Sequence, residues 1–165
     1  VRSKVNQGTT FVVDVPILCE KAVTEEKSKA ECAAMVLSGK QVLLVEDNYL
    51  NAEIATLLLK EKGIVVTLAE NGKVGVEKFA ASAPGTFDAV LMDIRMPVMD
   101  GYEAARAIRG MDRTDAHIVP IIAMTADAFE EDLRLAKSAG MDDFVTKPVD
   151  PQNLYRILYK AIHNG

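Results

Sequence analysis

Five polar side chains that could bind cations or anions each follow a short apolar segment of this sequence. They are Glu46 and Asp47 after residues 42–45, Asp93 after residues 87–92, Thr125 after residues 119–124, and Lys147 after residues 143–146. If the apolar segments are parallel strands of one sheet, their carboxyl ends meet at one edge and bring these side chains together. The sequence therefore predicts a single site of three acids, a hydroxyl and an ammonium.

Three acids in one site repel one another and need compensation of their charge. Two carboxylates about 4 Å apart repel by about 4 kcal/mol at an effective dielectric near 20. Glu46, Asp47 and Asp93 together therefore need a positive partner or raised pKa values. Few ligands, all of them oxygen, favour Mg²⁺ over Ca²⁺ or Zn²⁺. With Mg²⁺ and Lys147 neutralising charge, Asp93 could take a phosphoryl group by in-line attack, and Thr125 could then donate a hydrogen bond to it.

The same positions argue against nucleotide binding. The turn after residues 42–45 is Glu46-Asp47-Asn48, whereas nucleotide-binding folds place glycines there so that backbone N–H groups can approach phosphates. No P-loop and no Gly-x-Gly-x-x-Gly pattern occurs elsewhere in the sequence. We therefore do not expect this chain to phosphorylate itself from ATP.

Five strand-and-helix units are predicted to position these residues. Strands are expected over residues 42–45, 65–68, 87–92, 119–124 and 143–146, with helices over residues 74–81, 101–108 and 130–138. The first helix is predicted from Leu50, Ile54, Leu57 and Leu58, which lie at helical spacing before a C-cap at Gly63. The last helix is predicted to begin with Asp150 as N-cap and Pro151 at its first position. Strict alternation of this kind predicts an α/β fold with a parallel sheet covered on both faces.

Composition limits the function further. The 165 residues are 49% hydrophobic, and their formal charge of −5 argues against direct binding of nucleic acid. No apolar run approaches the roughly 18 residues needed to cross a bilayer, so we expect no membrane contact by this chain. Cys19 and Cys32 are expected to be free thiols in a reducing compartment. These features predict a cytoplasmic location, with a parent protein that could be anchored in the inner membrane.

At the level of motifs, residues 41–163 resemble the receiver domains of two-component signalling. The resemblance rests on four motifs in order, which are Glu46-Asp47, residues 92–97 with Asp100-Gly101, residues 124–126, and Lys147-Pro148. It implies a flavodoxin-like (βα)5 three-layer sandwich with a five-stranded parallel sheet in the order 2-1-3-4-5.

The resemblance also assigns roles to residues. It implies that Asp93 is the phosphoacceptor and that Mg²⁺ is held by Asp47, by Asp93, by the backbone carbonyl of Arg95 and, through water, by Glu46. Thr125 and Lys147 would contact the phosphoryl group, and the peptide bond between Lys147 and Pro148 would be cis.

A signal is expected to leave the site through Thr125 and Phe144. In the family, an aromatic residue at the position of Phe144 changes rotamer with phosphorylation, and a phenylalanine keeps this apolar movement but lacks the hydroxyl of tyrosine. Phosphorylation would then bias a two-state equilibrium in the surface formed by the fourth helix, the fifth strand and the fifth helix. The alternative for Phe144 is a core residue without a switching role.

The sequence before the receiver-like part suggests a longer parent. Residues 1–16 resemble the last strand of a histidine-kinase ATP-binding domain, residues 17–39 have the mixed charges of a linker, and residues 40–165 form the receiver domain. This order predicts the C-terminal end of a hybrid sensor histidine kinase. The expected partners are the kinase core of the same parent, a histidine phosphotransfer domain, or both.

Two other functions stay open from the sequence. One is a phosphatase of the haloacid type, with Asp93 as nucleophile, although such an enzyme needs an aspartate where this chain has Arg95. The other is a receiver-like binding module that accepts no phosphate. A receiver would instead catalyse its own phosphorylation and slow dephosphorylation.

Overall fold

The computed structural model describes residues 2–4, 8–10, 36–126 and 129–164. Strands β1 (Arg2–Lys4) and β2 (Gly8–Thr10) form an antiparallel pair. Most of residues 1–16, which resemble the last strand of a histidine-kinase ATP-binding domain, lie outside the described residues, as do Cys19 and Cys32.

Residues 36–164 contain five strands that alternate with helices. In chain order the elements are β3 (Gln41–Val45), α2 (Tyr49–Glu61), β4 (Val65–Ala69), α3 (Gly72–Ala81), β5 (Ala89–Asp93), α4 (Gly101–Arg109), the 3₁₀ helix η1 (Thr114–His117), β6 (Ile121–Thr125), α5 (Glu130–Ser138), β7 (Asp143–Thr146) and α6 (Pro151–Asn164). The strands form one sheet in the order β4-β3-β5-β6-β7, and every neighbouring pair is parallel. Counted from β3, this is the predicted order 2-1-3-4-5, so the flavodoxin-like α/β fold is confirmed.

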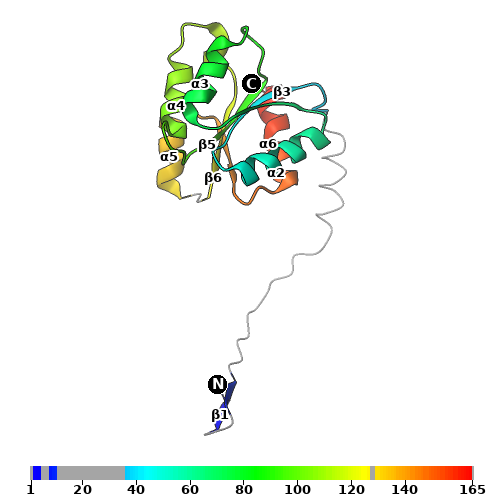
Figure 1. Cartoon of the computed structure of the whole chain (residues 1–165), viewed down its shortest axis with the longest axis vertical. Coiled ribbons are helices and arrows are strands. Elements are labelled where there is room, and N and C mark those ends of the chain that lie inside the picture. The colour runs from blue at the N-terminus through cyan, green and yellow to red at the C-terminus, as the bar shows by residue number, and fades with distance from the viewer. Residues whose placement is uncertain (1, 5–7, 11–35, 127–128, 165) are drawn as a thin grey trace.

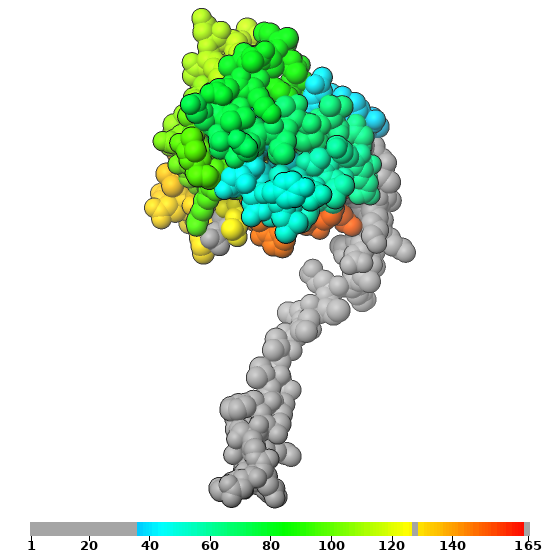
Figure 2. Space-filling view, in the orientation of Figure 1, coloured from blue at the N-terminus to red at the C-terminus, as the bar shows by residue number. Residues whose placement is uncertain are grey.

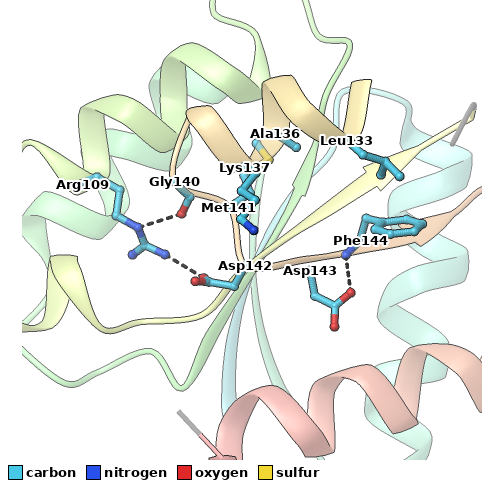
Figure 3. Close-up of a pocket in the computed structure, with 9 residues that line it drawn as sticks. All are labelled: Arg109, Leu133, Ala136, Lys137, Gly140, Met141, Asp142, Asp143 and Phe144. Carbon is cyan, nitrogen blue, oxygen red and sulfur yellow. Dashed lines mark hydrogen bonds and ion pairs between the residues drawn. The ribbon is translucent and has the colours of Figure 1, made fainter. Parts of the chain in front are cut away.

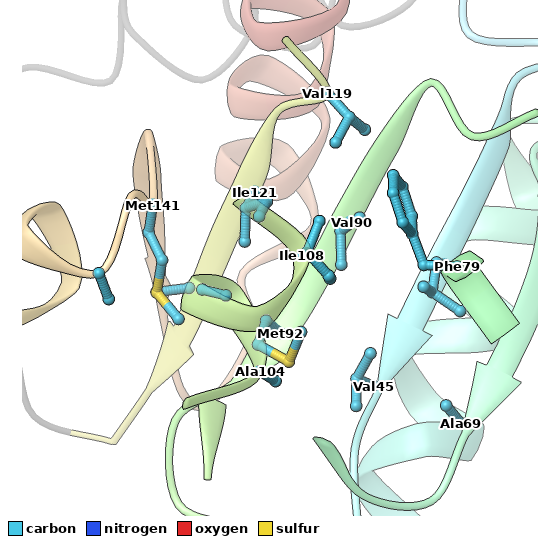
Figure 4. Packing of buried hydrophobic residues seen from close by; sticks show 14 of the residues in the cluster. Val45, Ala69, Phe79, Val90, Met92, Ala104, Ile108, Val119, Ile121 and Met141 are labelled. Carbon is cyan, nitrogen blue, oxygen red and sulfur yellow. The ribbon is translucent and has the colours of Figure 1, made fainter. Parts of the chain in front are cut away.

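Helices cover both faces of the sheet (Figure 1). Helices α3, α4 and α5 lie on one side, and α2 and α6 on the other. Both faces are buried because successive strand residues alternate between them. Val45, Val90, Met92 and Ile121 belong to the cluster on the α3–α4–α5 side, which Figure 4 shows. Their strand neighbours, such as Leu44 and Leu91, belong to the second cluster, beneath α2 and α6.

Helix α2 forms where the sequence predicts it but turns a different face to the core. Its side toward the sheet is made by the small residues Ala52 and Ala55 together with Leu59. Leu50 and Leu57 are each 62% exposed, and Figure 2 shows α2 on the open surface of the molecule. Alanines let a helix approach the sheet closely, so the larger side chains on neighbouring faces remain outside.

The packed part of the chain extends a little before residue 40. Leu37 is only 1% exposed and belongs to the core cluster on the α2–α6 side. The backbone N–H of Gly39 donates to the carbonyl of Gly63 at 2.9 Å, which fixes this segment beside the end of α2. Leu37 therefore connects the predicted linker directly to the core.

The last helix begins as predicted. Pro151 is its first residue, and the side chain of Asp150 accepts a hydrogen bond from the backbone N–H of Asn153 at 2.7 Å. At 14 residues α6 is the longest described helix, and within the described part of the chain no helix combines the length and apolarity needed to cross a membrane.

Candidate functional site

The three acids meet at the carboxyl end of the sheet. Strands β3 and β5 are neighbours, with Val45 opposite Met92, so Glu46 and Asp47 after β3 lie beside Asp93 at the end of β5. One carboxylate oxygen from each of the three lies within 4.8 Å of the others. Glu46 and Asp93 are buried and Asp47 is exposed. The convergence expected from the sequence is present, with one acid open to solvent.

Lys147 bridges two of the acids. Its Nζ lies 2.7 Å from Glu46 Oε2 and 2.7 Å from Asp93 Oδ2. Burial disfavours the charged ammonium, but the hydrogen bonds to Asp93 and Glu46 outweigh it and raise the pKa of Lys147. One ammonium facing three carboxylates leaves a charge of about −2 when all are ionised, which an oxygen-binding divalent cation would neutralise.

Glu46 is held by donors on α2 as well as by Lys147. Its Oε1 accepts from Asn51 Nδ2 at 3.1 Å and from the backbone N–H of Asn48 at 3.3 Å. Burial raises the pKa of Glu46, the hydrogen bond from Lys147 lowers it, and the charge of Asp93 raises it again, with a net rise. Both oxygens of Glu46 are thus bonded within the protein, which fits the indirect metal role that the family resemblance gave it.

Sequence reasoning missed Asn51. Its signal was weak, because the side chain of an asparagine in the first turn of a helix usually hydrogen-bonds to backbone groups at the helix end and not to a side chain that precedes the helix. Asn48 is the N-cap that satisfies this helix, accepting from Leu50 N and Asn51 N, so the side chain of Asn51 is left to orient Glu46.

Helix α4 fixes the main chain of Asp93. Gly101, the first residue of α4, donates its N–H to the carbonyl of Ile94 at 2.9 Å. A Cβ atom at Gly101 would collide with the carbonyl oxygen of Asp93 and lie 2.9 Å from the Cα of Ile94. Glycine is therefore required here by space, because α4 begins against the backbone of Asp93.

Thr125 and the peptide bond between Lys147 and Pro148 lie beside the acids at the same end of the sheet. Asp93 pairs with Met124 across β5 and β6, so Thr125, which is buried at the end of β6, is one residue beyond this pair. The carbonyl of Thr125 accepts from the backbone N–H of Lys147 at 2.7 Å. The bond between Lys147 and Pro148 is cis, as the family resemblance implied.

Phe144 lies on β7, in register with Ala123 of β6, and packs partly buried against the α3–α4–α5 side of the core. It lines an open pocket of about 580 Å³ under α5 (Figure 3), together with Leu133, Lys137 and Met141. Arg109 closes one side of this pocket, donating to the carbonyl of Gly140 at 2.9 Å and to Asp142 at 2.8 Å. Phe144 therefore lies beneath α5, on the strand next to the one that carries Thr125, and its ring borders open space.

Comparison with known protein families identifies the family to which this fold and its site belong. Residues 42–159 match the response regulator receiver domain. The chain belongs to the response regulator receiver family. The motifs singled out in the sequence therefore lie in a receiver domain of two-component phosphorelay signalling.

Related receivers occur in proteins of different sizes. Hybrid signal transduction histidine kinase I of Dictyostelium discoideum is 37% identical over 80% of this chain, and the chain spans only 8% of that kinase. The receiver domain of sensor histidine kinase PA1611 from Pseudomonas aeruginosa, solved with a magnesium ion in its active-site cleft, is 40% identical, with a TM-score of 0.69 over 76% of this chain and 98% of its own. The receiver domain of Saccharomyces cerevisiae Ssk1, solved with the histidine phosphotransfer protein Ypd1, is 33% identical, with a TM-score of 0.65 over 73% of this chain and 87% of its own.

Proposed function

We propose that this receiver domain takes a phosphoryl group from a phosphohistidine onto Asp93. The observation that carries the proposal is the 2.7 Å contact of the Lys147 ammonium with both Asp93 and Glu46 at the converged acids. An oxygen of Asp93 attacks phosphorus, the P–O bond forms as the P–N bond breaks, and the imidazole leaves with the electron pair. Lys147 loses none of its charge during the step and moves its hydrogen bond from the carboxylate to the transferred group.

Mg²⁺ is the cofactor that these residues fit. Asp47, Asp93 and the backbone carbonyl of Arg95 would hold it directly, with Glu46 acting through water. When bound, the ion neutralises charge on the phosphoryl oxygens. Support comes from the excess of carboxylates over ammonium groups at this edge, from the exposure of Asp47, and from the magnesium ion in the PA1611 receiver domain.

Thr125 and Phe144 are proposed to carry the signal away from the site. Thr125 would turn its hydroxyl toward the phosphoryl group, and Phe144 would move into the space this leaves. Phe144 borders a pocket of about 580 Å³ under α5, so its ring has room to change rotamer. The output surface is then the one formed by α5, β7 and α6.

The parent protein is proposed to be a hybrid sensor histidine kinase. Residues 1–16 would then be the end of its ATP-binding domain, residues 17–39 a linker, and residues 40–165 the receiver. The antiparallel pairing of β1 with β2 is compatible with the end of such a domain. The proposed phosphodonor is the kinase core of the parent or a histidine phosphotransfer domain, a class of protein that the Ssk1 receiver binds.

Incubation with acetyl phosphate and Mg²⁺ tests the function. We expect a stoichiometric mass increase of about 80 Da that is absent in Asp93→Asn and present in the control Asp112→Asn, which changes an exposed aspartate elsewhere. Continuous release of phosphate at enzymatic rates would indicate a phosphatase instead, and the absence of any adduct would indicate a binding module.

A further inference from the structure

Glu46 lies close enough to the other acids to be a direct metal ligand, yet donors of the protein occupy its oxygens. One carboxylate oxygen from each of Glu46, Asp47 and Asp93 lies within 4.8 Å of the others. The side chain of Glu46 is only 1% exposed, and each of its oxygens accepts at least one hydrogen bond. A direct ligand must offer a free lone pair to the ion. The contacts that hold Glu46 therefore determine how it can meet a cation.

The two oxygens of Glu46 are not equally occupied. Oε1 accepts from Asn51 Nδ2 at 3.1 Å and from the backbone N–H of Asn48 at 3.3 Å, which uses both of its lone pairs. Oε2 accepts a single hydrogen bond from the described residues, from Lys147 Nζ at 2.7 Å. Oε1 is thus closed to a metal ion, and Glu46 in this orientation cannot coordinate one through both oxygens.

The contact from Asn51 depends on how α2 begins. Asn48 is the N-cap, and Asn51 is the third residue of the helix. At the start of α4 the corresponding pair forms a capping box, in which the side chain of Glu103 accepts from the N–H of Asp100. At α2 the N–H of the N-cap donates to Glu46 instead, so the side chain at the third position is released from that role. An asparagine there has amide N–H groups to donate, and it donates one to the same oxygen of Glu46.

Asn51 is the better placed of the two donors to Oε1. Its distance of 3.1 Å lies within the usual range of about 2.7–3.2 Å, whereas the 3.3 Å of Asn48 exceeds it. A cavity of about 120 Å³ lies beside these groups, with Glu46, Asn51 and Lys147 in its lining. Without the amide of Asn51, Oε1 would be held by the longer bond alone, with space next to the carboxylate for it to turn.

Direct and indirect coordination by Glu46 would suit different cations. Mg²⁺ retains several waters and is bound directly by about one or two carboxylates, whereas Ca²⁺ takes about six to eight oxygen ligands and accepts a carboxylate through both oxygens. Asp47 and Asp93 supply enough carboxylates for Mg²⁺ without Glu46. A third carboxylate in direct contact would favour Ca²⁺ most, above all if both of its oxygens were free.

We propose that Asn51 is a positioning residue that keeps Glu46 from binding the metal ion directly, and that it thereby makes the site selective for Mg²⁺ over Ca²⁺. The inference rests on the proposed function, because it concerns the ion with which Asp93 would accept a phosphoryl group. Asn51 contributes no ligand of its own and acts through Glu46.

Metal titration of the unphosphorylated chain tests the proposal. Isothermal titration calorimetry gives the dissociation constants of Mg²⁺ and Ca²⁺ for the full chain and for Asn51→Ala, which removes the amide and leaves a residue of higher helix propensity. Loss of a partner that orients a metal ligand typically changes metal affinity by about 10–100-fold. We expect the ratio of the Ca²⁺ to the Mg²⁺ dissociation constant to fall about tenfold in Asn51→Ala, because Ca²⁺ gains the carboxylate of Glu46.

Two further variants separate this role from a structural one. Thr56→Ala is the matched control, because Thr56 is an uncharged polar residue on the same helix, and it should leave the ratio unchanged. Glu46→Gln tests whether Asn51 acts through Glu46. In that background, Asn51→Ala should change the ratio by less than about twofold.

Three results would overturn the proposal. If Asn51 only supports the local structure, Asn51→Ala weakens both ions equally and the ratio stays constant. A tenfold fall that persists in the Glu46→Gln background would show that Asn51 does not act through Glu46. An equal fall in Thr56→Ala would show that the ratio responds to any change in α2.

The two proposals fail differently. If the unaltered chain binds Mg²⁺ and takes phosphate from acetyl phosphate while Asn51→Ala keeps the same ratio, the role of Asn51 is refuted and the proposed function stands. If the unaltered chain neither binds Mg²⁺ nor takes phosphate from acetyl phosphate, the proposed function itself fails.

Discussion

Leu37 offers the sharpest test of where the folded domain begins. Replacing it with alanine removes most of a side chain that is 1% exposed within the α2–α6 side of the core. Such substitutions cost about 2–5 kcal/mol in fully buried positions. We expect a loss of about 3 kcal/mol in the free energy of unfolding, which is within this range.

Urea denaturation followed by circular dichroism measures this loss. With a slope of about 1.5 kcal/mol per molar urea, the midpoint should fall by about 2 M. Val36→Ala is the matched control, because Val36 is the adjacent residue and is 70% exposed, and its midpoint should move by less than about 0.3 M. If the urea midpoint of Leu37→Ala also moves by less than about 0.3 M, the reasoning is refuted. The folded domain would then begin at residue 40, as the sequence predicts.

Two further predictions concern Gly101 and Asp115. Gly101→Ala should cost about 1–3 kcal/mol of stability by overpacking and slow phosphorylation by acetyl phosphate by up to about 100-fold through displacement of Asp93. Gly110→Ala, where an added Cβ meets nothing closer than 3.3 Å, is its control, and equal rates for the two variants would contradict the prediction. For Asp115, the hydrogen bonds from Arg113 hold the pKa at about 2, below the ordinary 3.8. This depressed pKa stabilises the fold above pH 4, and the contribution disappears as the pH falls toward 2. In urea titrations Asp115→Asn should therefore be less stable than the unaltered chain at pH 5, with the difference narrowing below pH 4; a difference independent of pH would count against this account.

Much of the fold could be predicted because its signals are local. Residues 42–45 are an unbroken apolar run, as a strand buried on both faces requires, and Asp150 with Pro151 marks a helix start by capping chemistry alone. The position of the acids followed from the same pattern, since parallel strands end at one edge. Thus Glu46, Asp47 and Asp93 could be placed together before any coordinates were known.

Other features depend on three-dimensional packing and could not be predicted. The buried face of α2 is built on Ala52 and Ala55, and periodicity favours the larger Leu50 and Leu57 instead. The role of Asn51 requires Glu46 to be within reach of α2. Val98, in the loop after β5, has a φ of +73°, a conformation for which valine itself gives no signal.

The close fit of Gly101 against Asp93 also determines which parts of the domain are able to move. Helix α4 begins directly against the backbone of Asp93 at the end of β5, so a shift of the main chain there would also move the helix. Rearrangement on phosphorylation should therefore travel sideways across the sheet, from β5 to β6 and β7, while α4 stays in place as a rigid support. Hydrogen exchange should then change in α5 and β7 on addition of acetyl phosphate and remain constant in α4.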